Sequence, residues 1–423
     1  MHDHRATATS REVDVAIVGG GAAGIAAARH LAATGLTSIV LEASNRLGGR
    51  AATRHVDGIA FDLGCGWLHS AGRNPWVGIA EAAGFTVDRS RPAWGHQFRD
   101  VGFTAADQRA AAQAFTAFEA RLADAPPASD CAADALPPGG AWNANLDAIS
   151  GYINGVELGL LSGRDYLAYD AAASDDNWRV VEGYGALVAA HGRDLPVQLS
   201  TAVTAIDHRG RRLRVDTTAG TIDARFVVVT VATDILARGD IRFDPPLDDK
   251  LAAAGRLPLG LANKILLGLD GPEGLDADAH VIGDPRRADT GSYTLRPFGR
   301  PVIEGFFGGA GARALEALGA PGTFDFAVGE LGGLFGGDFA RRLRPLAASA
   351  WRGMPHVGGS YSHALPGWSG ARATLAAAVD GRLFFAGEAC SPTDFSTAHG
   401  AYRTGIDAAA AIVAASRHDA PGR

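Results

Sequence analysis

The sequence predicts a mixed α/β fold, and this prediction rests on the pattern of its first 41 residues. Residues 13–18 form a short apolar run rich in β-branched side chains, which is typical of a buried parallel strand. Residues 22–34 are mostly Ala, Ile and Leu and are followed by Gly35, as expected for a helix. Residues 37–41 form a second short apolar run. Strand, helix and strand in this order predict a Rossmann-like unit.

A glycine-rich turn joins the first strand to the helix, and its sequence, GGGAAG, fits the pattern G-x-G-x-x-G. Gly19 permits the tight turn, Gly21 lets the backbone approach a pyrophosphate, and Gly24 allows the helix to pack closely against the strand. The helix N-terminus then offers free N–H groups to the phosphates. Glu42 ends the second strand, where its carboxylate can bind a ribose. The unit therefore predicts a dinucleotide site, without separating NAD from FAD.

The composition limits the classes of protein to which this chain can belong. Hydrophobic residues make up 47% and charged residues 20%, which is typical of a folded globular chain. The formal net charge of −7 argues against a nucleic-acid partner. We expect no membrane span, because no apolar run reaches about 18 residues. Cys65, Cys131 and Cys390 make no C-x-x-C pair, so we expect reduced thiols, no metal site and a cytoplasmic location.

Several later motifs resemble the FAD-dependent amine oxidases, the family of the monoamine and polyamine oxidases. The first is RLGGR at 46–50, which resembles the loop that passes close to the cofactor in that family. The other matching segments follow in family order: GCGWLHS at 64–70, the strands around Val203 and at 226–231, NK at 263–264, GGSYS at 358–362, Gly-Glu at 387–388 and TAHGA at 397–401. The resemblance therefore implies a flavoprotein that oxidises amines.

The resemblance implies non-covalent FAD. The residues that would hold it are Gly19, Gly21, Ala23, Gly24, Glu42, Ala43, Arg50, Gly66, Trp67, Val203, Trp351, Gly387, Glu388, Thr397 and Ala398. Monoamine oxidases bond the flavin to a cysteine where this chain has Ser360, and a serine cannot form that thioether. They also carry a tyrosine where this chain has Thr397, a threonine shared with polyamine oxidases. The chain thus resembles the polyamine oxidase-like branch more than the mitochondrial monoamine oxidases.

Three residues are predicted to act in the reaction. Lys264 interrupts the apolar run 261–267, and a buried lysine must find a partner or lower its pKa. The resemblance implies that Lys264 holds a water beside the flavin N5 atom, that Tyr361 forms one wall of an aromatic cage, and that His69 lies near the substrate amine. Two alternatives stay open: Lys264 could lie on an exposed strand face, and His69 could have a purely structural role.

The resemblance also implies two domains, as in the amine oxidase or p-hydroxybenzoate hydroxylase-like flavoproteins. The predicted FAD-binding domain comprises 11–85, 179–255 and 376–416, and the substrate-binding domain comprises 86–178 and 256–375. Residues 1–10 and 417–423 are expected to be flexible termini.

Further elements are predicted from local patterns. They are a helix at 105–123, an antiparallel meander that starts with 197–203, a strand at 301–307, and two helices at 312–318 and 323–334. Four acidic residues could line an anionic entrance for polyamines or lie at solvated helix ends: Asp165, Asp170, Asp175 and Asp176.

The function implied is the oxidation of a C–N bond in a polyamine or another primary or secondary amine. A hydride equivalent passes to FAD, and O2 then reoxidises the flavin and gives H2O2. The expected partners are the small amine and O2, and a homodimer is left open. Two alternatives remain. L-amino-acid oxidases carry an arginine for the substrate carboxylate where this chain reads GCGWLHS, and a desaturase-like or non-catalytic flavoprotein would have no need for Lys264 and Tyr361.

Overall fold

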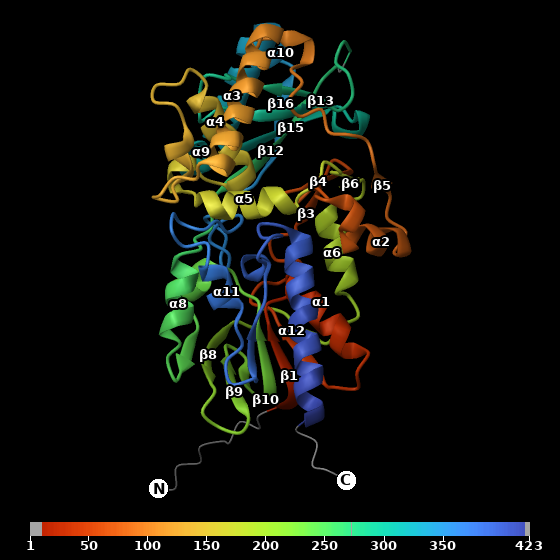
Figure 1. Cartoon of the computed structure of the whole chain (residues 1–423). Coiled ribbons are helices and arrows are strands. Elements are labelled where there is room, and N and C mark those ends of the chain that lie inside the picture. Colours follow the sequence, from red (N-terminus) through yellow and green to blue (C-terminus); the bar gives the residue numbers. More distant parts are fainter. Residues whose placement is uncertain (1–10, 272, 419–423) are drawn as a thin grey trace, which may run out of the picture.

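The computed structural model describes residues 11–271 and 273–418, which form two halves, each built around its own β-sheet (Figure 1). The half in the lower part of the view holds the larger sheet, with α1 (Ala22–Ala32) and α12 (Ala398–His418) in front of it. Residues 1–10 and 419–423, expected to be flexible, lie outside the described residues. Residues 417 and 418 belong to α12, so this part of the expected flexible terminus is helical.

The larger sheet has eight strands in the order β11-β8-β9-β10-β1-β2-β7, with β17 also paired to β10. Their bounds are β1 (Arg11–Val18), β2 (Ser38–Leu41), β7 (Val197–Gln198), β8 (Val203–Asp207), β9 (Leu213–Thr217), β10 (Gly220–Val229), β11 (Arg242–Asp244) and β17 (Leu383–Phe385). Strands β7, β2, β1, β10 and β17 are parallel. Strands β8, β9 and the first half of β10 form an antiparallel meander.

Strand β1 is buried on both faces, which explains its continuous apolar sequence. Val15 and Ile17 pack into the core under α1 and α12. Ala16 and Val18 point the other way, into a core that includes β8 and β9. The predicted unit of strand, helix and parallel strand is therefore confirmed.

Close helix packing brings α12 to the start of α1. An added Cβ at Gly405 would lie 2.1 Å from the carbonyl oxygen of Ala23, so only glycine permits this approach. The N-terminal end of α12 is thereby fixed relative to the glycine-rich turn that precedes α1.

The second sheet, in the upper part of Figure 1, is antiparallel and has the order β13-β14-β15-β12-β16. Its strands are β12 (Ala262–Leu269), β13 (Ala279–Ile282), β14 (Ser292–Leu295), β15 (Val302–Gly308) and β16 (Leu343–Ala348). The nearby helices are α3 (Ala105–Asp124), α4 (Asn143–Asn154), α9 (Gly309–Phe335) and α10 (Gly337–Ala340). Residues of α9 share a core with Ile265 and Leu267 of β12.

Shorter elements complete the fold. They are the helices α2 (Pro75–Ala82), α5 (Gly163–Ala172), α6 (Tyr184–His191), α7 (Thr233–Ala237), α8 (Asp248–Gly255) and α11 (Ala371–Ala376), the strands β3 (Thr53–Val56), β4 (Ile59–Asp62), β5 (Val87–Asp88) and β6 (Arg179–Val180), and the 3-10 helices at 71–73, 98–100, 132–135, 158–160, 297–299 and 388–390. Across residues 11–271 and 273–418, no helix has the length and apolar character needed to cross a membrane.

The structure confirms most of the local predictions and corrects one. The predicted helix at 105–123 is α3, and the predicted strand at 301–307 is β15. The two predicted helices after it are the two parts of α9, which is interrupted at Gly319, where φ is +72°. The meander prediction was wrong for 197–198, because these residues form β7 and pair in parallel with β2. The meander begins only at Val203, with β8.

A buried ion pair joins the two halves through α5, which lies between them in Figure 1. The Arg372 guanidinium binds both carboxylate oxygens of Asp165, each at 2.7 Å. The two side chains are only 3% and 2% exposed. Asp165 therefore lies neither at a solvated helix end nor at an entrance, and its expected exposure was wrong. Because neither charge reaches water, each charge must be compensated by the other.

We expect Arg372→Met to lower the free energy of unfolding by about 3–5 kcal/mol, because it leaves the buried Asp165 charge without a cationic partner. Urea unfolding followed by tryptophan fluorescence measures the change. The control is Arg341→Met, which removes a pair with Asp338 whose side chains are 74% and 93% exposed and should cost less than about 1 kcal/mol. Equal effects of the two variants would contradict the prediction.

Candidate active site

The turn between β1 and α1 depends on glycine at two positions. Gly19 has a φ of +106°, which residues with side chains rarely adopt. An added Cβ at Gly24 would lie 1.9 Å from the Gly19 carbonyl oxygen, so the helix could not approach the strand. By contrast, an added Cβ at Gly21 would meet no atom nearer than 4.0 Å. Space therefore remains before the first turn of α1, which contains Ala23, and a phosphate can be bound there.

Glu42 lies beside this turn, at the end of β2. Its carboxylate is buried and accepts a hydrogen bond of 2.6 Å from the Gly20 N–H. Its carbonyl oxygen accepts one of 2.8 Å from the N–H of Thr201, two residues before Val203. Glu42 and Ala43 thus lie at the edge of the sheet where the glycine-rich turn also lies, and the segment that leads into Val203 is bonded to Glu42.

The arginine–glycine loop predicted from RLGGR packs against the same turn. The Gly48 N–H donates to the Gly20 carbonyl oxygen at 2.8 Å. Arg46 donates to the carbonyl oxygen of Gly49 at 2.7 Å, which holds the loop in its shape. The loop then directs Arg50 towards the interior of the molecule.

The carboxylate of Glu388 is the centre of a buried network. It accepts hydrogen bonds from Arg50 at 2.7 Å, from the Ser362 hydroxyl at 2.7 Å and from the Ser396 N–H at 2.8 Å. Burial alone would raise the pKa of Glu388, but the positive charges of Arg50 and Arg372 more than offset it and lower that pKa below its usual value. Glu388 is therefore an anion at neutral pH.

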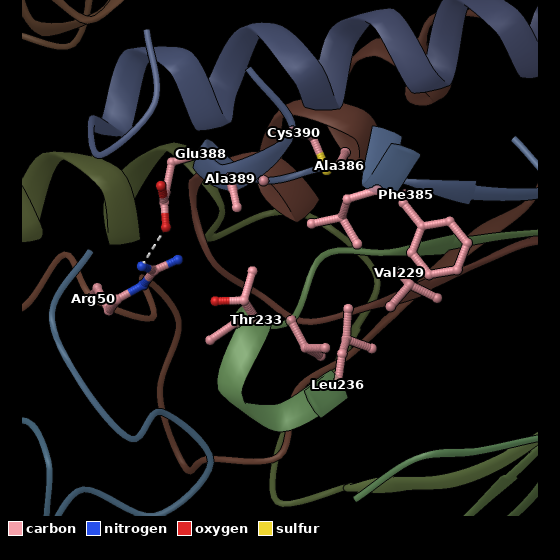
Figure 2. A pocket seen from close by; sticks show the side chains of 13 residues that line it. Arg50, Val229, Thr233, Leu236, Phe385, Ala386, Glu388, Ala389 and Cys390 are labelled. Carbon is pink, nitrogen blue, oxygen red and sulfur yellow. Dashed lines mark hydrogen bonds and ion pairs between the residues drawn. The ribbon is translucent and has the colours of Figure 1, made fainter. Parts of the chain in front are cut away.

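A cavity beside this network contains an unsatisfied hydroxyl (Figure 2). Arg50 and Glu388 lie at one end of the cavity, and Leu236 and Phe385 line its apolar part. Thr233 is 2% exposed, and its hydroxyl has no hydrogen-bond partner within the described part of the chain. Figure 2 shows this hydroxyl pointing towards the side of Arg50. Because a buried hydroxyl without a partner is costly, we expect a ligand group to bind there.

Lys264 lies in a second cavity. It is 7% exposed, so the alternative of a lysine on an exposed strand face is wrong. Its Nζ is 3.1 Å from Oε1 of Glu304, and an added Cβ at Gly66 would lie 2.8 Å from that Nζ. Trp67 and Asp62 line the same cavity. Burial lowers the pKa of Lys264, but the carboxylates of Glu304 and Asp62 more than offset it, so the pKa is raised above its ordinary value.

The segment from Asp62 to Gly66 is held in place from two sides. The Asp62 carboxylate accepts hydrogen bonds from the Thr53 hydroxyl at 2.5 Å and from the Tyr184 N–H at 2.8 Å. Trp351, which is 2% exposed, donates its indole N–H to the Leu63 carbonyl oxygen at 2.9 Å. Gly66 is thereby fixed next to the Lys264 amine.

The segment GGSYS passes beside β12. The Ser360 hydroxyl accepts from the N–H of Ala262 and donates to its carbonyl oxygen, both at 2.8 Å. Tyr361 donates its hydroxyl to the carbonyl oxygen of Tyr152, on α4, at 2.5 Å. Burial raises the pKa of Tyr361, so its hydroxyl stays protonated. Tyr361 therefore belongs to the α4 side of the site, where the Tyr152 and Phe306 rings are 6.0 Å apart.

Thr397 caps the start of α12. Its hydroxyl donates to the Asp394 carbonyl oxygen at 2.6 Å and accepts from the Gly400 N–H at 3.0 Å. Ala398 is the first residue of the helix. The helix N-terminus, with its partial positive charge, is thus held in a fixed position.

His69 is neutral at pH 7, because burial lowers its pKa to about 4 and the positive charge of Lys264 adds to this. Its Nδ1 lies 2.7 Å from the amide oxygen of Asn177, which can only accept, so Nδ1 carries the proton. The ring centroid is 6.3 Å from that of Trp94. His69 therefore lies in the region of Lys264 without contacting it.

The structure arranges most of the predicted residues in two adjoining groups, one around the glycine-rich turn and Glu388 and one around Lys264. Tyr361 and His69 are not among the residues that line the Lys264 cavity. Ser360 joins the two groups, because its carbonyl oxygen accepts from Arg50 at 2.9 Å while its hydroxyl binds Ala262 of β12. Three residues at these cavities were not predicted: Asp62, Thr233 and Glu304. A charged residue within the apolar run 302–308 was the sequence feature that could have indicated Glu304.

Comparisons with known proteins agree with this arrangement. A family model described as flavin containing amine oxidoreductase matches residues 22–413. Polyamine oxidase 5 of Oryza sativa subsp. japonica is 28% identical, over 93% of this chain and 86% of that protein. Polyamine oxidase 2 of Arabidopsis thaliana is 27% identical, over 95% of this chain and 88% of that protein.

A solved structure of a putrescine oxidase bound to putrescine has the same fold, with a TM-score of 0.77, and covers 96% of this chain and 100% of that one at 19% identity. The predicted two-domain α/β fold is therefore confirmed, as is the resemblance to the polyamine oxidase-like branch. With the family model spanning nearly the whole described chain, this protein belongs to the flavin-containing amine oxidoreductases and uses FAD as its cofactor.

Proposed function

We propose that this chain oxidises a C–N bond of a polyamine or another primary or secondary amine, with O2 as the acceptor of the electrons. The observation that carries the proposal is the Lys264 amine, buried and charged, within contact distance of Gly66. The names of its relatives support a polyamine substrate, since they include several polyamine oxidases.

The residues fit FAD in two respects. Gly21 leaves space before α1 for the phosphates, and the unsatisfied Thr233 hydroxyl faces the side of the cavity where Arg50 and Glu388 lie. The residues proposed to hold FAD follow: Gly19, Gly21, Ala23 and Gly24 at the phosphates, Glu42, Ala43 and Val203 at the adenosine, Arg50, Gly387 and Glu388 at the sugar chain, and Gly66, Trp67, Trp351, Thr397 and Ala398 at the flavin ring. The proposed FAD-binding domain, 11–85, 179–255 and 376–416, contains every strand of the larger sheet.

Non-covalent binding is proposed from the state of three side chains. The Ser360 hydroxyl is occupied in both directions by Ala262. Burial raises the pKa of Cys65 and that of Cys390 to about 12, so both thiols stay protonated and unreactive at neutral pH. The three unpaired cysteines also support the proposed cytoplasmic location.

Bound FAD supplies the electron chemistry, taking a hydride equivalent from the amine and passing electrons to O2, which gives H2O2. The chain's own residues orient the amine and set the charges around it. The N-terminus of α12 and the Lys264 ammonium both stabilise negative charge that develops during the reaction. Tyr361 offers an aromatic face to the amine, and His69, being neutral, does not repel a cationic substrate.

The charges near Lys264 favour an amine over an amino acid. Two arginines line this cavity, Arg179 and Arg300. Arg179 forms ion pairs with Asp88 at 2.6 Å and Asp278 at 2.8 Å. Arg300 donates to backbone carbonyl oxygens at 3.1 and 2.9 Å. The carboxylates of Asp88 and Asp278 neutralise the Arg179 charge, although its buried Nε has no hydrogen-bond partner within the described residues. A substrate carboxylate would therefore have to compete with these ion pairs, which weighs against the L-amino-acid oxidase alternative.

The proposal is tested by anaerobic bleaching of the flavin absorbance with a panel of polyamines, monoamines, cyclic amines and L-amino acids. We expect an amine to bleach the flavin and amino acids not to. Bleaching by amino acids alone would favour the L-amino-acid oxidase. A flavin-loaded protein that no member of a broad panel bleaches would contradict the proposal.

Precipitation with acid should release all of the flavin into the supernatant, because neither Ser360 nor the buried thiols of Cys65 and Cys390 can hold it covalently. Absorbance of the supernatant against that of the native protein measures the released fraction. A pellet that remains yellow would show that the proposed non-covalent binding is wrong.

We expect Thr233→Val to weaken FAD binding by about 0.5–1.5 kcal/mol, or roughly 2- to 13-fold in Kd, because the nearly isosteric side chain cannot hydrogen-bond to the cofactor. Titration of the flavin-free protein with FAD, followed by fluorescence, gives the Kd. Thr374→Val, at an exposed position on α11, serves as the control and should leave the Kd unchanged. An unchanged Kd in Thr233→Val would mean that the hydroxyl does not contact FAD.

A further inference from the structure

The chain has only two lysines among its 39 lysine and arginine residues, and both are buried. Lys250, on α8, donates to backbone carbonyl oxygens at the end of α11, including those of Thr374 at 2.6 Å and Leu375 at 3.0 Å. These acceptors carry no net charge, and burial lowers the pKa of Lys250. Lys264 is buried to the same extent, 7% exposed, but its partner is a carboxylate.

We propose that Glu304 is a positioning residue that keeps Lys264 as an ammonium ion, aimed at Gly66 and the cavity beside it. The inference deepens the proposed function, because it rests on the placement of Lys264 next to the flavin. The contact between Nζ and Oε1 is 3.1 Å, and the Glu304 side chain is 25% exposed, at the rim of the cavity.

The strand register explains this geometry. Lys264 pairs with Phe306 and Leu266 pairs with Glu304 across β12 and β15. Alternate residues of a strand point to the same face, so Lys264 and Glu304 are diagonal neighbours on one face of the sheet. The opposite face carries Ile265, which packs towards α9. The register alone therefore places a carboxylate within reach of the lysine.

The other charged groups around Lys264 cannot replace Glu304. Asp62 attracts the ammonium, but burial raises the pKa of Asp62 itself, and its oxygens are already engaged by Thr53, Tyr184 and the Gly185 N–H. The remaining titratable or charged neighbours on the packed elements are Cys65, whose pKa is raised by burial, neutral His69, and the arginines Arg179 and Arg300, whose charges oppose that of Lys264.

Without Glu304, the effect of burial on the pKa of Lys264 should exceed that of the remaining carboxylate. The pKa should therefore fall, and Lys264 should lose its proton at a lower pH. A neutral amine could still bind a water molecule. It could not stabilise negative charge that develops beside it, so the effect on the reaction would appear as a new pH dependence and not as a uniform loss.

The two lysines permit a direct measurement. In holoprotein labelled with 13C at lysine Cε, only two side-chain signals arise, and Lys264→Met assigns them. We expect the wild-type Lys264 signal to show no titration up to pH 10, while that of Lys250 titrates lower than an ordinary lysine, whose pKa is about 10.4. In Glu304→Gln the pKa of Lys264 should be lowered by about 1–3 pH units, with the Lys250 signal unchanged.

Glu157→Gln is the matched control, since it removes a carboxylate from another ion pair, with Arg313 at 2.9 Å, and should leave the Lys264 signal unchanged. Should Glu304→Gln fail to fold, Glu304→Asp serves as the second variant. Its shorter side chain lengthens the contact with the Lys264 amine and should also lower the pKa of Lys264. The rate of flavin reoxidation in Glu304→Gln should gain a pH dependence with the midpoint found by NMR.

A wild-type Lys264 that titrates below pH 9, or a Glu304→Gln signal that does not move, would overturn the inference. These NMR results do not depend on which substrate is oxidised. Failure of the amine panel would count against the proposed function alone, and failure of the titration would count against the role of Glu304 alone.

Discussion

Burial of the Glu388 carboxylate is the constraint on which the rest of the structure depends. An anion that is 5% exposed must be compensated by charge and hydrogen bonds, and here the partners come from distant segments: Arg50, Ser362 and Ser396. Arg372 donates to the Ser362 hydroxyl at 3.0 Å and pairs with Asp165 of α5. One buried charge thus fixes the positions of the arginine–glycine loop, the segment beside β12 and the helix between the two halves.

The second sheet serves two purposes because the faces of β12 differ. Ile265 and Leu267 face α9 and form the hydrophobic core of the upper half. Lys264 and Leu266 face the other way, and Leu266 packs against Phe61. Packing on the first face holds the strand rigid, so the lysine on the second face has a fixed position. Stability and function are therefore supplied by alternate residues of a single strand.

Local patterns predicted the glycine-rich turn, β1 and α1, because each depends on neighbours within a few residues. The role of Lys264 in β12 was implied by the family resemblance, since the local pattern alone left an exposed lysine open. The two-residue strand β7 was assigned to the wrong pairing, since so short a run carries no periodicity. The partner of Asp165 lies 207 positions away in the sequence, and no local pattern indicates such a contact. Glu304 was missed for a related reason: only the register of β12 and β15 brings it to Lys264.

The burial of both lysines has a chemical consequence for an enzyme of this kind. Oxidation of a primary amine followed by hydrolysis yields an aldehyde, and aldehydes condense with exposed lysine amines to form adducts and cross-links. Here Lys250 and Lys264 are each 7% exposed, and the surface cations are arginines, whose guanidinium groups are far weaker nucleophiles. The surface of the protein is thereby poor in the amine groups that an aldehyde would modify.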